Sequence, residues 1–240
     1  MVAEQPDIFA TIQGAFRDAG ALMRTRMNVY WILAAVCALA VLLTLRWAGS
    51  VTDVATEQQL RIQGPLQSIN LCSAIAWFFI LPAAIRTVRP EFKLTFMLVL
   101  GLIGIGLVVG FATEIGLVLL IAPGIWVGVK LSQATWAYVM PAGKNPFEES
   151  WEMATGHFWE TFGFYLLLGI LVGLVLFAVL LIPVGVAVFV PLSGVVLGPI
   201  AFLGYVYCYH VSVLGNMRWM LELRRLGGGA AERPAPGAPV

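Results

Sequence analysis

The longest apolar run of the chain extends from residue 94 to residue 140, and its only charged residues are Glu114 and Lys130. A helix rises about 1.5 Å per residue, so roughly 20 residues cross a hydrocarbon core about 30 Å thick. The run is too long for one crossing and must turn back on itself. Its polar break at Gly110–Glu114 predicts a tight hairpin, with Glu114 at the outer end. The predicted spans on either side of this hairpin are 94–111 and 115–140.

The composition of the whole chain is typical of a membrane protein. Of the 240 residues, 60% are hydrophobic and 11% are charged, whereas a soluble domain has about 25% charged residues. So few charges cannot cover a folded chain with polar surface, and lipid is therefore the expected solvent. Nucleic-acid binding has no support, because the sequence has no basic cluster with interleaved aromatic residues. Three cysteines without metal-type spacing are interpreted as buried or lipid-facing residues: Cys37, Cys72 and Cys208.

The apolar runs predict an all-α membrane protein, a bundle of six membrane-spanning helices in one polytopic domain of residues 1–226. The polar residues 46–66 are interpreted as a loop. Pro183 and Pro191 interrupt the uncharged stretch 182–198 and Pro199 follows it, so this stretch is interpreted as an outer loop or a re-entrant segment. The tail 227–240 is rich in Gly, Ala and Pro and is expected to be disordered. The predicted spans are 28–45, 68–85, 94–111, 115–140, 161–181 and 199–220.

Two interfacial amphipathic helices are predicted outside the spans. Apolar residues recur at helical spacing over residues 8–24, which favours a helix in the headgroup region or against the protein's own cytoplasmic side. Asn145 is a good N-cap, Pro146 suits the first helical position and Gly156 is a natural stop, so a short helix is predicted at 146–155. Its candidate surface for the membrane or a partner consists of Phe147, Glu148, Glu149, Trp151 and Glu152.

The basic residues predict the orientation. One side of the predicted topology carries only Arg46 and Arg61. The positive-inside rule places the other, more basic side in the cytoplasm. Both termini are then cytoplasmic, in agreement with an even number of crossings. The basic residues of the cytoplasmic side are Arg17, Arg24, Arg26, Arg86, Arg89, Lys93, Lys144, Arg218, Arg224 and Arg225.

Lys130 is the centre of a candidate buried polar site. Pro123-Gly124 predicts a kink or break in the fourth span. Along a continuous helix, Lys130 would lie about ten residues, or ~15 Å, from Met140 and hence near the bilayer midplane. The open hypotheses are a substrate, ion or lipid-headgroup site, a structural hydrogen bond, or a misplaced span boundary. A lone histidine such as His210 is more typical of hydrogen-bonded packing than of a ligand. The candidate partners at similar depth are Gln133, Tyr205, Tyr209 and His210.

The stretch from Pro123 to Trp159 resembles a family of bacterial integral membrane proteins. This family groups YciC-like inner-membrane proteins with the membrane domain of some glycerophosphodiester phosphodiesterases. The shared pattern is a Pro-Gly-Ile start of a helix, a later basic residue, and a short helix with a serine before a Gly-His/Arg-Phe/Trp ending. The resemblance implies the bacterial inner membrane and a six-span layout, and most members have no assigned activity. The matching residues are Pro123, Gly124, Ile125, Lys130, Ser150, Gly156, His157, Phe158 and Trp159.

These features predict a non-catalytic inner-membrane protein that organises lipid or a partner protein at the cytoplasmic face. No Ser/His/Asp set, metal-ligand cluster or phosphate-binding loop is recognisable in the sequence, so no catalytic residue, cofactor or metal is expected. The expected partners are membrane lipids and another membrane protein or a second copy of the chain. The alternative function is a transporter or permease-like subunit with its site at the broken fourth span around Lys130. A membrane enzyme acting on phospholipid is a third class, suggested only by the resemblance.

Overall fold

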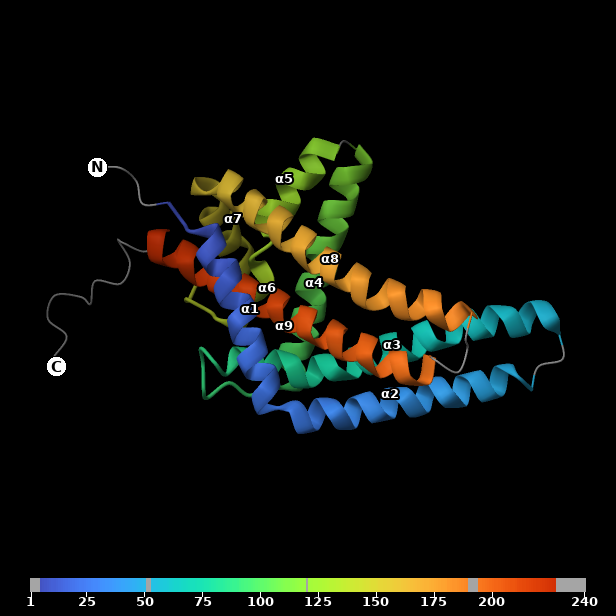
Figure 1. Ribbon diagram of the computed structural model, residues 1–240. Helices are drawn as coiled ribbons and strands as arrows, with labels where there is room; N and C mark the ends of the chain where they lie inside the picture. Colours follow the sequence, from blue (N-terminus) through green and yellow to red (C-terminus); the bar gives the residue numbers. More distant parts are fainter. Residues whose placement is uncertain (1–4, 51–52, 120, 190–193, 228–240) are drawn as a thin grey trace, which may run out of the picture. The chain divides into compact units, whose positions relative to one another are not determined.

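A computed structural model describes residues 5–50, 53–119, 121–189 and 194–227. Within these ranges the regular structure is entirely α-helical and contains no strand, which confirms the predicted all-α class. The helices, shown in Figure 1, are α1 (Ile8–Thr25), α2 (Met27–Ala48), α3 (Val54–Ile85), α4 (Phe96–Leu119), α5 (Ile121–Leu131), α6 (Ala134–Val139), α7 (Pro146–Gly156), α8 (Phe158–Phe189) and α9 (Gly194–Gly227).

Four of the described helices contain a segment long and apolar enough to cross a membrane. Large apolar side chains on these helices are exposed, for example Ile32, Leu107 and Phe177, as expected for positions that face lipid. The apolar part of α3, Ala74–Ile85, is shorter. The count of six crossings therefore stays a prediction. The four segments are Met27–Ala48, Phe96–Gly116, Phe158–Val179 and Leu197–Leu226.

Most of the predicted polar loop 46–66 is helical, so this prediction is wrong. α3 begins at Val54, immediately after Asp53, whose Oδ2 accepts a hydrogen bond from Thr56 N at 2.9 Å. This is an N-cap, and the residues that follow include Ala, Glu, Gln, Leu and Arg, all good helix formers. A polar sequence is therefore compatible with helix here, and polarity alone does not indicate a loop.

The outer loop predicted at 182–198 is wrong where the structure describes it, whereas the alternative of a re-entrant segment stays a prediction. α8 continues to Phe189 and α9 begins at Gly194, while residues 190–193 lie outside the described residues. An apolar segment without water must satisfy its backbone hydrogen bonds internally, which favours continued helix despite the prolines. The predicted disordered tail lies, beyond Gly227, outside the described residues as well.

α4 and α5 form a hairpin whose turn is not where the sequence predicted it. α4 runs through Gly110–Glu114 without turning and reaches Leu119. A Cβ added at Gly116 of α4 would lie 2.6 Å from the Cα of Gly124 in α5, and a Cβ at Gly128 would lie 3.2 Å from Thr113 Cγ2. The two helices are therefore antiparallel and in close contact, and at Gly116 a Cβ would overlap the backbone of Gly124.

The fourth predicted span is broken, but not at Pro123-Gly124. Pro123 lies in the first turn of α5, where its missing N–H removes no helical hydrogen bond. The interruption occurs at Ser132-Gln133, between the end of α5 at Leu131 and the start of α6 at Ala134. A proline near a helix start is thus compatible with a regular helix.

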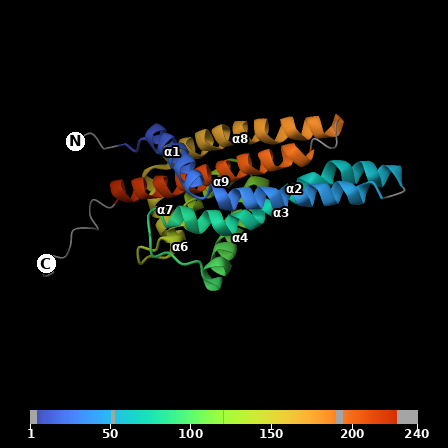
Figure 2. The same ribbon diagram turned by 60° about the horizontal axis from the view of Figure 1, so that its bottom comes forward.

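The chain divides into two compact units, and α1, α8 and α9 contribute residues to both. Unit 1 comprises Met1–Gly14, Lys93–Leu168 and Gly215–Val240, and unit 2 comprises Ala15–Phe92 and Gly169–Leu214. In unit 2, α2 and α3 lie side by side (Figures 1 and 2). Residues of α9 join them in one apolar cluster: Tyr30, Ala34, Cys37, Val41, Cys72, Ala76, Ile80, Ala201, Phe202 and Val206.

Candidate functional site

The candidate site in unit 1 is built on α7, whose limits agree with the sequence prediction. Asn145 caps the helix, because its side-chain oxygen accepts a hydrogen bond from Phe147 N at 3.0 Å. Pro146 is the first helical residue and Gly156 the last. α7 packs against both α5 and α6. Its polar side chains therefore meet the interruption between these two helices.

Ser150 of α7 joins the two sides of this interruption. Its hydroxyl donates to Lys130 O at 2.7 Å and accepts from Gln133 N at 3.1 Å. Ser150 and Gln133 are fully buried. A helix end leaves backbone N–H and C=O groups without intrahelical partners, and burial makes such groups costly unless they are paired. The serine satisfies one carbonyl at the end of α5 and one N–H before α6.

The ammonium of Lys130 lies beneath two tryptophans. Lys130 Nζ donates to Thr155 Oγ1 at 2.6 Å and lies 5.7 Å from the ring centroid of Trp126 and 5.5 Å from that of Trp151. The two indoles meet edge to face, with ring centroids 4.8 Å apart. Lys130 is 4% exposed, whereas Trp126 is 43% and Trp151 38% exposed. The buried cation is thus in contact with two rings that are themselves partly exposed. Each cation–π contact contributes roughly 0.5–2 kcal/mol.

The depth expected for Lys130 assumed a continuous helix to Met140. That premise is wrong, because α5 ends at Leu131. The distance along one helix axis to Met140 therefore gives no measure of depth. The groups that hold the lysine come from α7, through the Thr155 hydroxyl and the Trp151 ring.

The predicted partners of Lys130 have other contacts. Gln133 meets the lysine only through Ser150, and its Nε2 donates to Tyr165 OH at 2.8 Å. Tyr209 lies in unit 2 and stacks on Tyr205, with ring centroids 6.3 Å apart. Neither Gln133 nor Tyr209 contacts the Lys130 ammonium within the described residues.

His210, the remaining candidate, lies in unit 2 and is completely buried. Its Nδ1 is 2.8 Å from Val206 O, and its Nε2 is 2.9 Å from Tyr30 OH. A carbonyl oxygen can only accept, so Nδ1 carries the proton and Nε2 accepts from the tyrosine hydroxyl. Both ring nitrogens are therefore used within unit 2.

A series of hydrogen bonds links the interruption between α5 and α6 to α8 and α9. Tyr165 OH of α8 accepts from Gln133 Nε2 and donates to Asn216 Oδ1 of α9 at 2.5 Å. Next to these residues along α8 and α9, Phe164 stacks on Trp219, with ring centroids 4.7 Å apart and an interplanar angle of 3°. Gln133 Oε1 is buried and has no partner among the described residues. The interruption is therefore tied to both α8 and α9.

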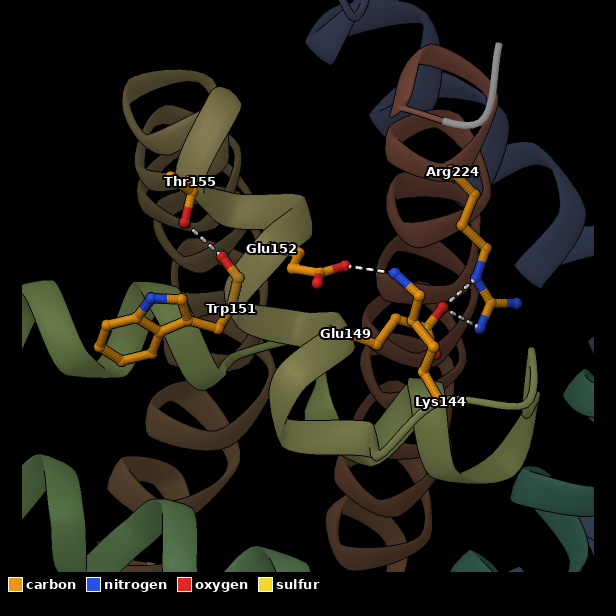
Figure 3. A network of polar contacts seen from close by, with 6 residues as sticks. All are labelled: Lys144, Glu149, Trp151, Glu152, Thr155 and Arg224. Atoms are coloured by element: carbon orange, nitrogen blue, oxygen red, sulfur yellow. Dashed lines mark hydrogen bonds and ion pairs between the residues drawn. The ribbon is translucent and has the colours of Figure 1, made fainter. Parts of the chain in front are cut away.

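Glu149 points inward from α7 and pairs with Arg224 of α9, as Figure 3 shows. Arg224 Nε and Nη2 lie 2.7 Å and 2.6 Å from Glu149 Oε1, and Nη2 also donates to Met140 O at 2.6 Å. Glu149 is only 6% exposed. Its place on the exposed acidic surface predicted from the sequence is therefore wrong. A guanidinium that pairs with the carboxylate makes its burial tolerable.

The other candidate surface residues of α7 remain at least partly exposed. Glu148, Trp151 and Glu152 are exposed, and Phe147 is half-buried. Glu152 accepts a hydrogen bond from Lys144 Nζ at 2.5 Å (Figure 3). This bond raises the pKa of Lys144 above its ordinary value. These four residues are thus accessible, and their role as a surface for the membrane or a partner stays a prediction.

Sequence reasoning missed several residues that build the site. Trp126 precedes Lys130 by one helical turn, and Thr155 follows Trp151 by one turn, so their spacing was an available signal. Tyr165 and Arg224 had no local signal. Arg224, for example, is 75 positions from Glu149 in the sequence. Only the packing of α7, α8 and α9 brings them to the site.

No protein-family model, curated protein or solved structure matches this chain. The resemblance to YciC-like membrane proteins therefore stays a prediction. In the part of the chain that the structure describes, no three His, Cys, Asp or Glu residues are grouped so that they could hold a metal ion.

Proposed function

We propose that this protein is a non-catalytic, multi-pass protein of the bacterial inner membrane that organises lipid or a partner protein at the cytoplasmic face. The observation that carries the proposal is that α7 has one buried, bonded side and one exposed side. On the buried side, Glu149 forms an ion pair with Arg224, and the Ser150 hydroxyl bonds the backbone of Lys130 and Gln133. Its outer surface, defined here as Glu148, Trp151, Glu152 and the adjacent Trp159, is exposed.

A helix held in this way suits a binding surface. Because the backbone is already fixed, binding orders little of it and costs less conformational entropy. Exposed tryptophans are favoured both at membrane interfaces and at the centres of protein interfaces. Trp159 is 74% exposed. These properties support contact with lipid headgroups or with a partner.

Contacts within unit 1 support a common side of the membrane for α7 and both chain ends. Arg224, which binds Glu149, lies in the last turn of α9. A Cβ at Gly14 of α1 would lie 2.5 Å from Arg218 Nη1 of α9. The basic residues at this end of α9 favour the cytoplasmic side.

The proposal is tested by native mass spectrometry of the protein extracted into polymer nanodiscs from its own membrane. We expect a reproducible lipid set or a stoichiometric protein with the wild type. The double variant Glu148→Lys/Trp159→Ala is expected to lose it. Trp47→Ala removes a similarly exposed tryptophan, 59% exposed at the end of α2, and should retain it. Retention by all three proteins, or by none, would contradict the proposal.

A second candidate function, a transporter subunit, is favoured by the interruption between α5 and α6. Discontinuous helices with buried polar groups are typical of transport sites, and Gln133 Oε1 is such a group. Proteoliposomes loaded with a membrane-potential dye would report ion flux. The transporter hypothesis expects a flux that Gln133→Leu abolishes, and a protein-free baseline for the wild type would rule out ion transport.

A further inference from the structure

Lys130 carries a buried positive charge that no acid in the described chain balances. Two of the three acidic residues of α7 are already engaged, because Glu149 pairs with Arg224 and Glu152 with Lys144, and the third, Glu148, forms no ion pair with Lys130 in the part of the chain that the structure describes. No ion pair involves Lys130 among the described residues. A buried ammonium is costly unless it is paired, and two ring faces and one hydroxyl offset only part of that cost. An anionic ligand would complete the pairing.

The ammonium also has hydrogen-bonding capacity to spare. It has three N–H donors, and Thr155 Oγ1 accepts one of them. The Thr155 hydroxyl itself donates to Trp151 O at 2.6 Å. Within the described residues, neither indole N–H, of Trp126 or of Trp151, donates to another protein group. A ligand with several acceptor oxygens therefore fits this cluster better than a neutral ligand.

The groups found in contact with the ammonium are the side chains of Thr155, Trp126 and Trp151. Thr155 is exposed, as are the rings of Trp126 and Trp151. A ligand could therefore reach the ammonium by displacing these exposed side chains. Side-chain rotations at exposed positions are fast compared with binding.

Apolar residues extend from this cluster along α5. Ile121 is 71% and Ile125 is 39% exposed, and both precede Trp126 on the same helix. A ligand with a phosphate at Lys130 could thus lay hydrocarbon along α5. Tryptophans are characteristic of the depth at which lipid phosphates lie.

We propose that Lys130, Trp126 and Trp151 bind the phosphate of an anionic phospholipid, whose acyl chains lie along Ile121 and Ile125. This site deepens the lipid branch of the proposed function and rests on it. Glu152, the acid that follows Trp151, is matched by Lys144, so it does not exclude an anionic headgroup. The site shares Trp151 with the outer surface of α7. It differs from that surface because it requires Lys130 and does not require Trp159.

The test uses the full chain in nanodiscs that contain phosphatidylcholine with either phosphatidylglycerol or no anionic lipid. Native mass spectrometry counts the lipids that remain bound. The wild type should retain phosphatidylglycerol in preference to phosphatidylcholine. Lys130→Met should weaken this retention about tenfold, the effect of losing one charge-assisted hydrogen bond. Lys130→Arg should preserve it, because an arginine keeps the charge and the ring contacts.

Lys93→Met is the matched control, since it removes an exposed lysine from the same unit without releasing Glu152 from its ion pair. It should retain phosphatidylglycerol as the wild type does. If Lys130→Met fails to fold, as judged by thermal unfolding and gel filtration, Trp126→Leu replaces it, with the same expected loss. Equal retention of the two lipids by the wild type, or unchanged retention by Lys130→Met, would overturn the proposal.

A second arm distinguishes a lipid from a free phosphate. Glycerol 3-phosphate is added to the protein in phosphatidylcholine nanodiscs at millimolar concentration. The lipid proposal expects no retained glycerol 3-phosphate, and its Lys130-dependent retention would overturn the lipid source. Failure of this site leaves the proposed function testable, because the Glu148→Lys/Trp159→Ala comparison does not involve Lys130.

Discussion

At the scale of single residues, α7 is held by side chains that pair with groups far away in the sequence. The Ser150 hydroxyl forms hydrogen bonds with the backbone on both sides of the α5–α6 interruption, and the Glu149 carboxylate forms an ion pair with Arg224. Both residues are buried. Their removal would leave buried polar groups without partners, which costs more than the hydrogen bonds themselves contribute.

Ser150→Ala is expected to lower the free energy of unfolding by about 1–3 kcal/mol, because Lys130 O and Gln133 N lose their partner. The measurement is thermal or denaturant unfolding in detergent micelles. Ser50→Ala is the matched control, since the Ser50 hydroxyl bonds Trp47 O at an exposed position. It should change stability by less than about 0.5 kcal/mol. Similar losses from the two variants would contradict the role assigned to Ser150.

Glu149→Ala is expected to destabilise the protein by about 3 kcal/mol or more, because it leaves the Arg224 guanidinium partly buried without its anion. In the exposed Lys144–Glu152 pair the side chains are 55% and 53% exposed. Lys144→Ala should therefore leave the unfolding temperature unchanged, since solvent screens that pair. The two variants are compared in the same unfolding assay. An equal shift of the unfolding temperature would mean that Glu149 is not held as described.

The sequence predicted some of these residues and not others, for a physical reason. Asn145, Pro146 and Gly156 define α7 because capping depends on neighbours a few positions away. The roles of Glu149 and Thr155 depend on partners brought in by tertiary packing. Lys130 is recognisable in the sequence as a charge in an apolar run. Its contacts with α7 are not, because the sequence predicts the break at Pro123-Gly124, whereas α5 ends only at Leu131.

At the scale of elements, the α4–α5 hairpin depends on glycine at its crossing. Gly116→Ala is expected to cost about 1–3 kcal/mol of stability, because the new Cβ would meet the backbone of Gly124, which cannot rotate away. Gly104→Ala, in the same helix, meets nothing within 4 Å and should be neutral or slightly stabilising. Unfolding in detergent measures both. No loss for Gly116→Ala would show that the helices do not cross there.

The helices themselves were easier to predict than their ends. Apolar length indicated α2, α4, α8 and α9, since the bilayer fixes how long a span must be. The ends of α3, α4 and α8 were missed. In each case a polar or proline-containing stretch was interpreted as a turn, although backbone hydrogen bonding and a local cap, such as Asp53, kept it helical.

At the scale of the whole molecule, four described segments are long and apolar enough to cross a membrane, and large apolar side chains are exposed on them. Six crossings, the inner membrane and cytoplasmic termini remain predictions from the apolar runs and the basic residues. They require that α7 and the end of α9 lie in the cytoplasm, whereas the end of α2 lies outside.

The most direct test is the accessibility of single cysteines to a membrane-impermeant maleimide. Glu148→Cys places a thiol on the outer surface of α7 and Ser50→Cys places one after α2, while the native cysteines, all buried, give the background. If α7 is cytoplasmic, Glu148→Cys reacts in inside-out vesicles and not in intact cells, and Ser50→Cys shows the reverse. Reaction of Glu148→Cys in intact cells would contradict a cytoplasmic α7, and with it the proposed function.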